Sequence, residues 1–171
     1  MKKTFLGLAF VLPIFATPSE ELMKKGYEVF KRSCSACHVE YMSHKEMRQV
    51  RMKVMKGEKP PIQAPPMNMI ALRVKYFYPE EDEFTEFVKD YITEPMREKG
   101  VCMPMAFKLF GVMPPIGKAL SEEEKEAVAY WIYHRYKGSW EEMMKKFNKH
   151  GRGMHGHGKS IMERPALQRK D

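Results

Sequence analysis

No part of the sequence shows the alternation of apolar and polar residues that a half-buried β-strand requires, and this absence favours an all-α protein. A long apolar run is also lacking, since the hydrophobic stretch over residues 5–15 is too short to span a bilayer. Cysteine is scarce, with three residues in 171. Three cysteines cannot all pair within one chain, so at least one must be free, intermolecular or bonded to something other than sulfur.

The first 16 residues have the layout of a secretory signal peptide. Lys2 and Lys3 precede the apolar stretch and the small residue Ala16 follows it, which predicts cleavage near Ala16. Ile14 is bulkier than the residue usual two positions before a cleavage site, so an uncleaved anchor is the alternative. We expect a periplasmic protein without a lipid anchor, because no cysteine follows the cleavage region. Export excludes nucleic acid as a partner.

Positive charge is unevenly distributed along the chain, whose formal net charge is +8. Residues 17–136 contain 19 Lys and Arg against 18 Asp and Glu, whereas residues 137–171 contain 9 against 4. The body is therefore almost neutral and the C-terminal segment is basic. This asymmetry predicts docking to a partner protein with an acidic surface, or contact of the C-terminal extension with an anionic membrane surface.

The spacing of apolar residues predicts four helices, over residues 19–30, 44–56, 84–92 and 121–135. Ser19 is the expected cap of the first helix, and Ser121 with Glu124 forms a capping box for the last. Prolines make residues 60–66 a loop. Three glycines, three prolines and three methionines predict an irregular loop over residues 100–117.

A C-terminal extension follows Gly138. Ser139 and Glu142 form a second capping box, which opens an amphipathic stretch with Trp140 on its apolar face. That face either packs on the body or docks on a partner. From Gly151 onward the composition predicts a disordered tail, in which the histidines leave metal binding open. We expect three parts: a signal peptide over residues 1–16, a globular domain over 17–137, and this extension over 138–171.

The sequence Cys34-Ser-Ala-Cys37-His38 is the CxxCH pattern of covalent haem attachment. Two thiols at this spacing can each add to one haem vinyl group, and the following imidazole can bind the iron as its fifth ligand. A thioredoxin-like redox pair would need a strand and helix context that this sequence lacks. Half of a zinc site would need further Cys or His residues at suitable spacing. The pattern therefore predicts one haem c bound through Cys34 and Cys37.

Features on both sides of this motif resemble the class I cytochrome c family, over residues 19–136. Gly26 and Phe30 precede the motif where that family has a small residue and an aromatic, which let its first and last helices cross closely. Trp131, with Val128, would be the crossing partner. The resemblance implies an all-α, class I cytochrome c fold, in which helices and long loops wrap around one haem.

The segment Ala64-Pro65-Pro66-Met67 is similar to the family's Gly-Pro-x-Leu loop. In that loop the proline carbonyl accepts a hydrogen bond from the proximal imidazole, which fixes the ring and raises its basicity. The resemblance assigns this role to Pro65, with Pro66 as the alternative, because Ala replaces Gly and Met replaces Leu.

Met113 is the sixth ligand that the resemblance implies, because Met113-Pro114 comes shortly before the last helix, as in the family's Met-Pro loop. The main competitor is Met103, which is also followed by a proline. Two histidines are weaker alternatives. His44 is close to the attachment site, and His134 falls on the last helix.

His38 and Met113 together would fill both axial positions of the iron, so no protein residue need be catalytic. The leading hypothesis is therefore a periplasmic carrier that passes single electrons between protein redox partners. The alternative is a haem c subunit of a multi-subunit oxidoreductase, for example in sulfur-compound oxidation or a respiratory chain. The long interval over residues 39–99 and the extension favour this alternative, because a minimal carrier needs neither. An open-site sensor or peroxidase is a third possibility. The leftover Cys102 is expected to be a buried thiol, with an intermolecular disulfide as the alternative.

Overall fold

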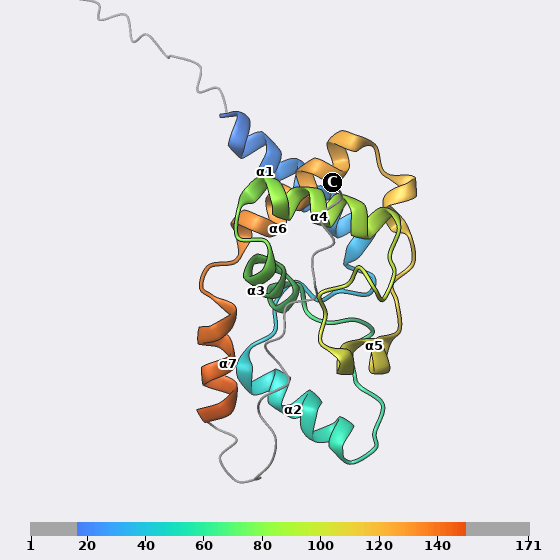
Figure 1. The fold of residues 1–171 in the computed structure, drawn as a ribbon, viewed down its shortest axis with the longest axis vertical. Coiled ribbons are helices and arrows are strands. Elements are labelled where there is room, and N and C mark those ends of the chain that lie inside the picture. Colours follow the sequence, from blue (N-terminus) through green and yellow to red (C-terminus); the bar gives the residue numbers. More distant parts are fainter. Residues whose placement is uncertain (1–16, 150–171) are drawn as a thin grey trace, which may run out of the picture.

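The computed structural model describes residues 17–149, and over this range the chain forms helices and loops without a strand (Figure 1). The all-α prediction is confirmed. The elements in chain order are α1 (Pro18–Val29), a π-helical turn η1 (Phe30–Cys34), α2 (His44–Met55), α3 (Met67–Phe77), α4 (Glu81–Thr93), α5 (Pro104–Phe110), a 3₁₀ turn η2 (Ile116–Ala119), α6 (Glu122–Arg135) and α7 (Trp140–Lys149). The predicted signal peptide and the His-rich tail lie outside the described residues.

The cap of α1 differs from the prediction. Thr17, not Ser19, accepts a hydrogen bond from the main-chain N–H of Glu20 at 3.3 Å, and the Glu20 carboxylate accepts one from the Thr17 N–H at 2.8 Å. Pro18 explains the shift, because proline has no N–H to lose and a backbone angle that suits the first helical position. The helix therefore begins before Ser19. The predicted capping box of α6, by contrast, is confirmed at Ser121 and Glu124.

Two helices were not predicted. Within residues 100–117, expected to be an irregular loop, α5 begins at Pro104 and is followed by Gly111, whose φ is +73°. Proline at the start and glycine just past the end are the residues that helix termini favour, so they delimit this helix rather than exclude it. The other, α3, directly follows the proline-rich loop and has Pro66 as its N-cap residue.

The main core forms where α1 crosses α6 and where α4 packs beside them (Figure 1). Gly26 is buried at the crossing, and the Phe30 ring stacks on Trp131 with ring centroids 4.7 Å apart. Phe84 brings α4 into the same core and is fully buried. The predicted role of Gly26, Phe30 and Trp131 at a close crossing of the first and last helices of the domain is confirmed.

The C-terminal helix α7 packs on the body through a second, smaller core. Trp140 and Met143 are buried against Leu72 of α3. Of the two uses expected for the apolar face of the extension, packing on the body is the one observed. Between residues 17 and 149, no helix has both the length and the apolar composition needed to cross a membrane.

Candidate functional site

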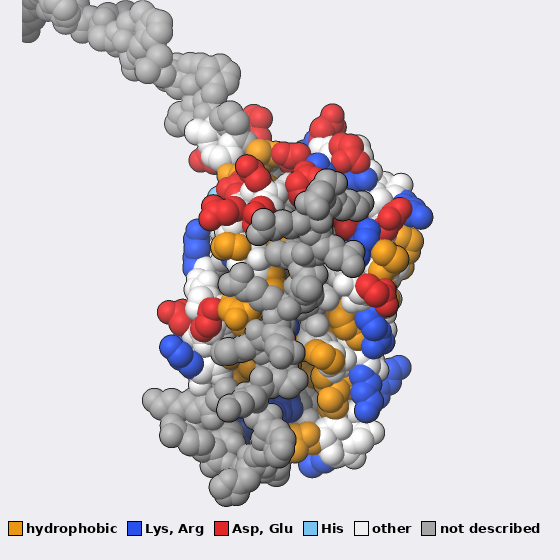
Figure 2. Space-filling view, in the orientation of Figure 1, with side chains coloured by type: hydrophobic (Ala, Val, Ile, Leu, Met, Phe, Trp, Pro, Cys, Tyr) orange, Lys and Arg blue, Asp and Glu red, His pale blue; other side chains and the backbone are white. Residues whose placement is uncertain are grey.

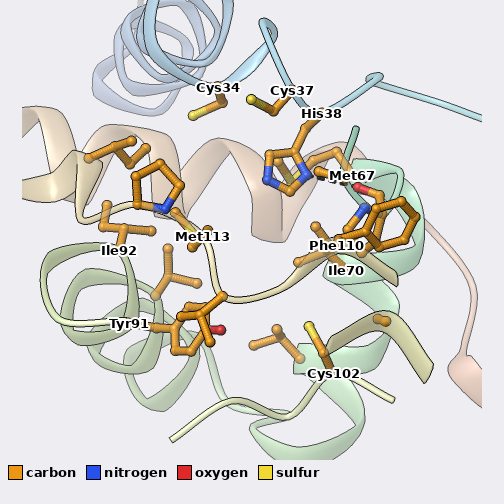
Figure 3. A pocket seen from close by; sticks show the side chains of 18 of the residues that line it. Cys34, Cys37, His38, Met67, Ile70, Tyr91, Ile92, Cys102, Phe110 and Met113 are labelled. Carbon is orange, nitrogen blue, oxygen red and sulfur yellow. Dashed lines mark hydrogen bonds between the residues drawn. The ribbon is translucent and has the colours of Figure 1, made fainter. Parts of the chain in front are cut away.

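A cavity of about 320 Å³ lies between α3, α4, α5 and the segment that carries the two neighbouring cysteines (Figure 3). Most of its walls are apolar, and Cys34, Cys37, His38, Pro65 and Met113 all line it. The structure thus brings together every site residue that the sequence predicted. Several of the apolar residues belong to the helices around the cavity: Ile70, Val74, Val88, Ile92 and Phe107.

The π-helical turn η1 and the tight turn that follows it position the two thiols. The π-helical turn contains one more residue than a regular helical turn, and it ends at Cys34, whose side chain is buried. The chain then turns tightly, since the N–H groups of Cys37 and His38 both donate to the Cys34 carbonyl, at 3.1 and 2.9 Å. Both cysteines are free thiols. Burial, with a smaller contribution from Cys37, raises the pKa of Cys34 to about 11, so this thiol is protonated at neutral pH.

His38 is held in one orientation and one tautomer. Its Nδ1 lies 2.8 Å from the carbonyl oxygen of Pro65. A carbonyl can only accept, so Nδ1 carries the proton and Nε2 keeps a free lone pair. Burial lowers the pKa of His38, and the bond to Pro65 only partly opposes this effect. The imidazole is therefore neutral at neutral pH, which is the form that binds a metal.

The Pro65 loop is fastened to the chain that follows His38. The N–H of Met67 donates to the Val39 carbonyl at 2.9 Å. The side chain of Asn68 accepts from the N–H of Met42 and donates to its carbonyl, both at 3.1 Å. Asn68 is a positioning residue that sequence reasoning missed. Its signal was a lone amide between apolar neighbours at the start of a helix, which points to a satisfied buried polar group.

Met113 reaches the cavity from the loop between α5 and α6 (Figure 3). Met103 does not line the cavity and packs instead near Leu72. Neither histidine considered as an alternative lines it. His44 lies against the Phe147 ring at 4.9 Å, and His134 is hydrogen-bonded to Glu81 at 3.0 Å.

Cys102 lines the cavity away from Cys34 and Cys37 (Figure 3). Burial of the sulfur raises its pKa, so the thiol is neutral, but the residue as a whole is only partly buried, which agrees in part with the expected buried thiol. The Arg73 guanidinium lies behind this part of the wall, and its Nε donates to the carbonyl of Val101 at 2.6 Å. The Nη1 of Arg73 is buried and has no hydrogen-bond partner among the described residues. Sequence reasoning did not single out Arg73.

A family model described as "Cytochrome C oxidase, cbb3-type, subunit III" matches residues 21–132, from α1 to near the end of α6. The chain belongs to the cytochrome c family. A cytochrome c domain implies a covalently bound haem and haem-based electron transfer. An uncharacterized protein of Aquifex aeolicus (strain VF5) is 64% identical over 155 residues, which are 91% of this chain and 100% of that protein. No solved structure matches the chain.

The chemistry of the cavity fits a haem. Apolar walls suit the flat macrocycle, and two free thiols at CxxC spacing suit thioether bonds. A neutral imidazole and a thioether on the same cavity are a suitable pair of axial ligands. No group of three or more His, Cys, Asp or Glu side chains that could hold a separate metal ion occurs within residues 17–149.

Proposed function

We propose that this cytochrome c domain is a periplasmic mono-haem electron carrier, with His38 and Met113 as the axial ligands. The observation that carries the proposal is a single cavity lined by two free thiols, a neutral imidazole and the Met113 thioether. When bound, haem c supplies a one-electron iron couple. Cys34 and Cys37 would hold it covalently, and His38 and Met113 would leave no position for a substrate.

The protein's own residues set the conditions for that couple. The Pro65 carbonyl makes His38 a stronger electron-pair donor by accepting a hydrogen bond from its Nδ1–H. The apolar walls keep water away, and Arg73 places a positive charge behind one wall. We infer outer-sphere transfer, in which no side chain need act as an acid or a base.

Intact-mass measurement and optical spectra test this proposal. Chain expressed with a haem-attachment system should gain the mass of one haem, retain it after denaturation, and resist carbon monoxide when reduced. Cys34→Ser with Cys37→Ser should abolish retention. A wild-type chain without covalent haem would refute the proposal. Ready binding of carbon monoxide would instead show an open iron position, as in a sensor or peroxidase.

We also propose export. The cap of α1 needs only Thr17 and Glu20, the first of which directly follows the expected cleavage site at Ala16. Mature protein that begins near Thr17, recovered from a periplasmic fraction, is the expected result of N-terminal sequencing. A mature chain that retains Lys2 and Lys3 would overturn this part of the proposal.

An acidic protein is the partner that we propose, and α2 is the surface that suits it. Lys45, Arg48 and Lys56 are exposed and form no ion pair in the described part of the chain. Beside them Met52 and Met55 are 48% and 54% exposed. Arginine and methionine are enriched at protein interfaces. Acidic side chains gather instead at the end where α1, α4 and α6 lie (Figure 2), so the molecule is electrically polarised.

A haem subunit of a larger complex is the second candidate, and the matched family model favours it because its description names an oxidase subunit. Gel filtration of native extract at low and high salt separates the two candidates. A free carrier elutes as a small haem protein at both. A subunit elutes with a larger complex, and Lys45→Glu with Arg48→Glu should release it if α2 is the docking surface. The matched control is Lys24→Glu, an exposed lysine on α1.

A further inference from the structure

Arg73 is held by two aromatic rings and one carbonyl. Its guanidinium carbon lies 4.8 Å from the centre of the Trp140 ring in α7 and 5.0 Å from that of Phe77 in α3. Its Nε donates to Val101 at 2.6 Å. These contacts hold a long, flexible side chain in a partly buried position and fix the direction of its charge.

The position of this cation is costly by itself. Burial lowers the pKa of Arg73, and Nη1 has no partner among residues 17–149. Cys102, its titratable neighbour in the cavity wall, is a neutral thiol and does not compensate the charge. Arginine side chains normally extend their charged end into water. Something must therefore hold Arg73 in place, and Trp140 is the group that covers it from outside the domain.

Trp140 is well suited to this task because it is itself buried and packed in the smaller core. It is 5% exposed and shares a core with Leu72 and Met143. The family match ends at residue 132, before α7 begins, so Trp140 comes from the extension whereas Arg73 lies in the matched part of the domain.

We propose that Trp140 is a positioning residue for the haem site, which holds the Arg73 guanidinium against the cavity wall so that its charge raises the reduction potential. The inference rests on the proposed function, because it requires a haem in the cavity. The C-terminal extension is then part of the electrostatics of the redox centre. A positive charge near the iron favours the reduced state, which carries one positive charge fewer.

Potentiometric titration of the holoprotein tests the inference. Trp140→Leu and Arg73→Gln should each lower the equilibrium constant for reduction by about three- to tenfold, which is about 30 to 60 mV for one electron. Trp140→Phe should restore most of the potential, because it keeps a ring against the guanidinium. In the double variant, Trp140→Leu should add nothing to the effect of Arg73→Gln, since Trp140 acts through Arg73.

Met143→Leu is the matched control, because Met143 lies in the same small core and the substitution conserves volume. It should leave the potential unchanged. The inference would be overturned if the potential fell equally in Met143→Leu. It would also be overturned if the shift caused by Trp140→Leu persisted in the Arg73→Gln background. If Trp140→Leu and Trp140→Phe both keep covalent haem, normal spectra and an unshifted potential, the inference about Trp140 is overturned. The proposed function then still stands. A wild-type chain without covalent haem would refute the proposed function as well.

Discussion

Gly26 of α1 and Trp131 of α6 meet with no room for a side chain between them. A Cβ atom placed on Gly26 would lie 2.5 Å from the Cβ of Trp131, and the carbonyl of Ala127 would be closer still. Two helices far apart in sequence thus cross at backbone distance. Phe30, one helical turn further, then stacks on the Trp131 ring.

We predict that Gly26→Ala destabilises the fold by about 1 to 3 kcal/mol or more, because the crossing is backbone against backbone and overpacking has no easy relief. Chemical denaturation of the holoprotein measures the loss. Glu28→Ala, at an exposed position of the same helix, is the control and should change stability by less than about 0.5 kcal/mol. Equal stability of Gly26→Ala and wild type would contradict the crossing.

Asn68→Ala should loosen the loop that holds Pro65 against His38. Both main-chain groups of Met42 would lose their partner, at a cost of roughly 1 to 3 kcal/mol. The reduction potential should also change, because the imidazole is less firmly held. Asn68→Asp keeps the acceptor for the Met42 N–H but loses the donor, so its stability should lie between that of the wild type and that of Asn68→Ala. An unchanged reduction potential in Asn68→Ala would show that the Pro65 loop does not control how firmly His38 is held.

Met113→Ala should abolish the weak far-red band that a methionine sulfur gives on oxidised haem, and it should allow carbon monoxide to bind the reduced protein. Met103→Ala is the matched control, since Met103 packs away from the cavity. It should keep the band and lose only packing energy. A band that survives in Met113→Ala and disappears in Met103→Ala would reverse the assignment.

Stability should fall as the pH rises above about 10, partly through Tyr91. Burial, with a smaller contribution from Cys102, raises the pKa of Tyr91 from 10.0 to about 12. In this window the unfolded chain releases the phenolic proton while the folded chain keeps it, so alkali favours unfolding. Denaturation midpoints between pH 9 and 12 should decline less steeply in Tyr91→Phe. A decline of equal slope would exclude Tyr91 as a cause.

The attachment motif could be predicted because it is local: CxxCH is five consecutive residues. The crossing of the first and last helices was predicted from the resemblance to the class I cytochrome c family at Gly26, Phe30 and Trp131. By contrast, α3 was missed because its buried residues do not lie on one stripe: Met67, Asn68, Ala71, Leu72 and Val74 are all buried. Such a segment gives no clear amphipathic pattern.

The contact between Arg73 and Trp140 could not be predicted, because nothing local links a residue of α3 to one of α7. The same holds for the placement of Cys102 in the cavity wall. Both depend on how α3, α5 and α7 pack, which is a property of the tertiary structure. The preference for Met113 over Met103 came from the resemblance, and the structure adds that Met113 lines the cavity whereas Met103 packs against the second core.

The π-helical turn η1 allows Gly26 and Cys34 to point in two directions that a regular helix would tie to each other. Gly26 must face α6 for the helices to cross, and Cys34 must face the cavity. The extra residue in Phe30–Cys34 changes the rotational phase between these two positions without disturbing either. Deleting one residue there would restore α-helical phase and turn the thiol away from the cavity by about 100°, while the crossing stayed intact. The length of this segment is thus as constrained as the identity of its two end residues, Phe30 on the Trp131 ring and Cys34 in the cavity wall.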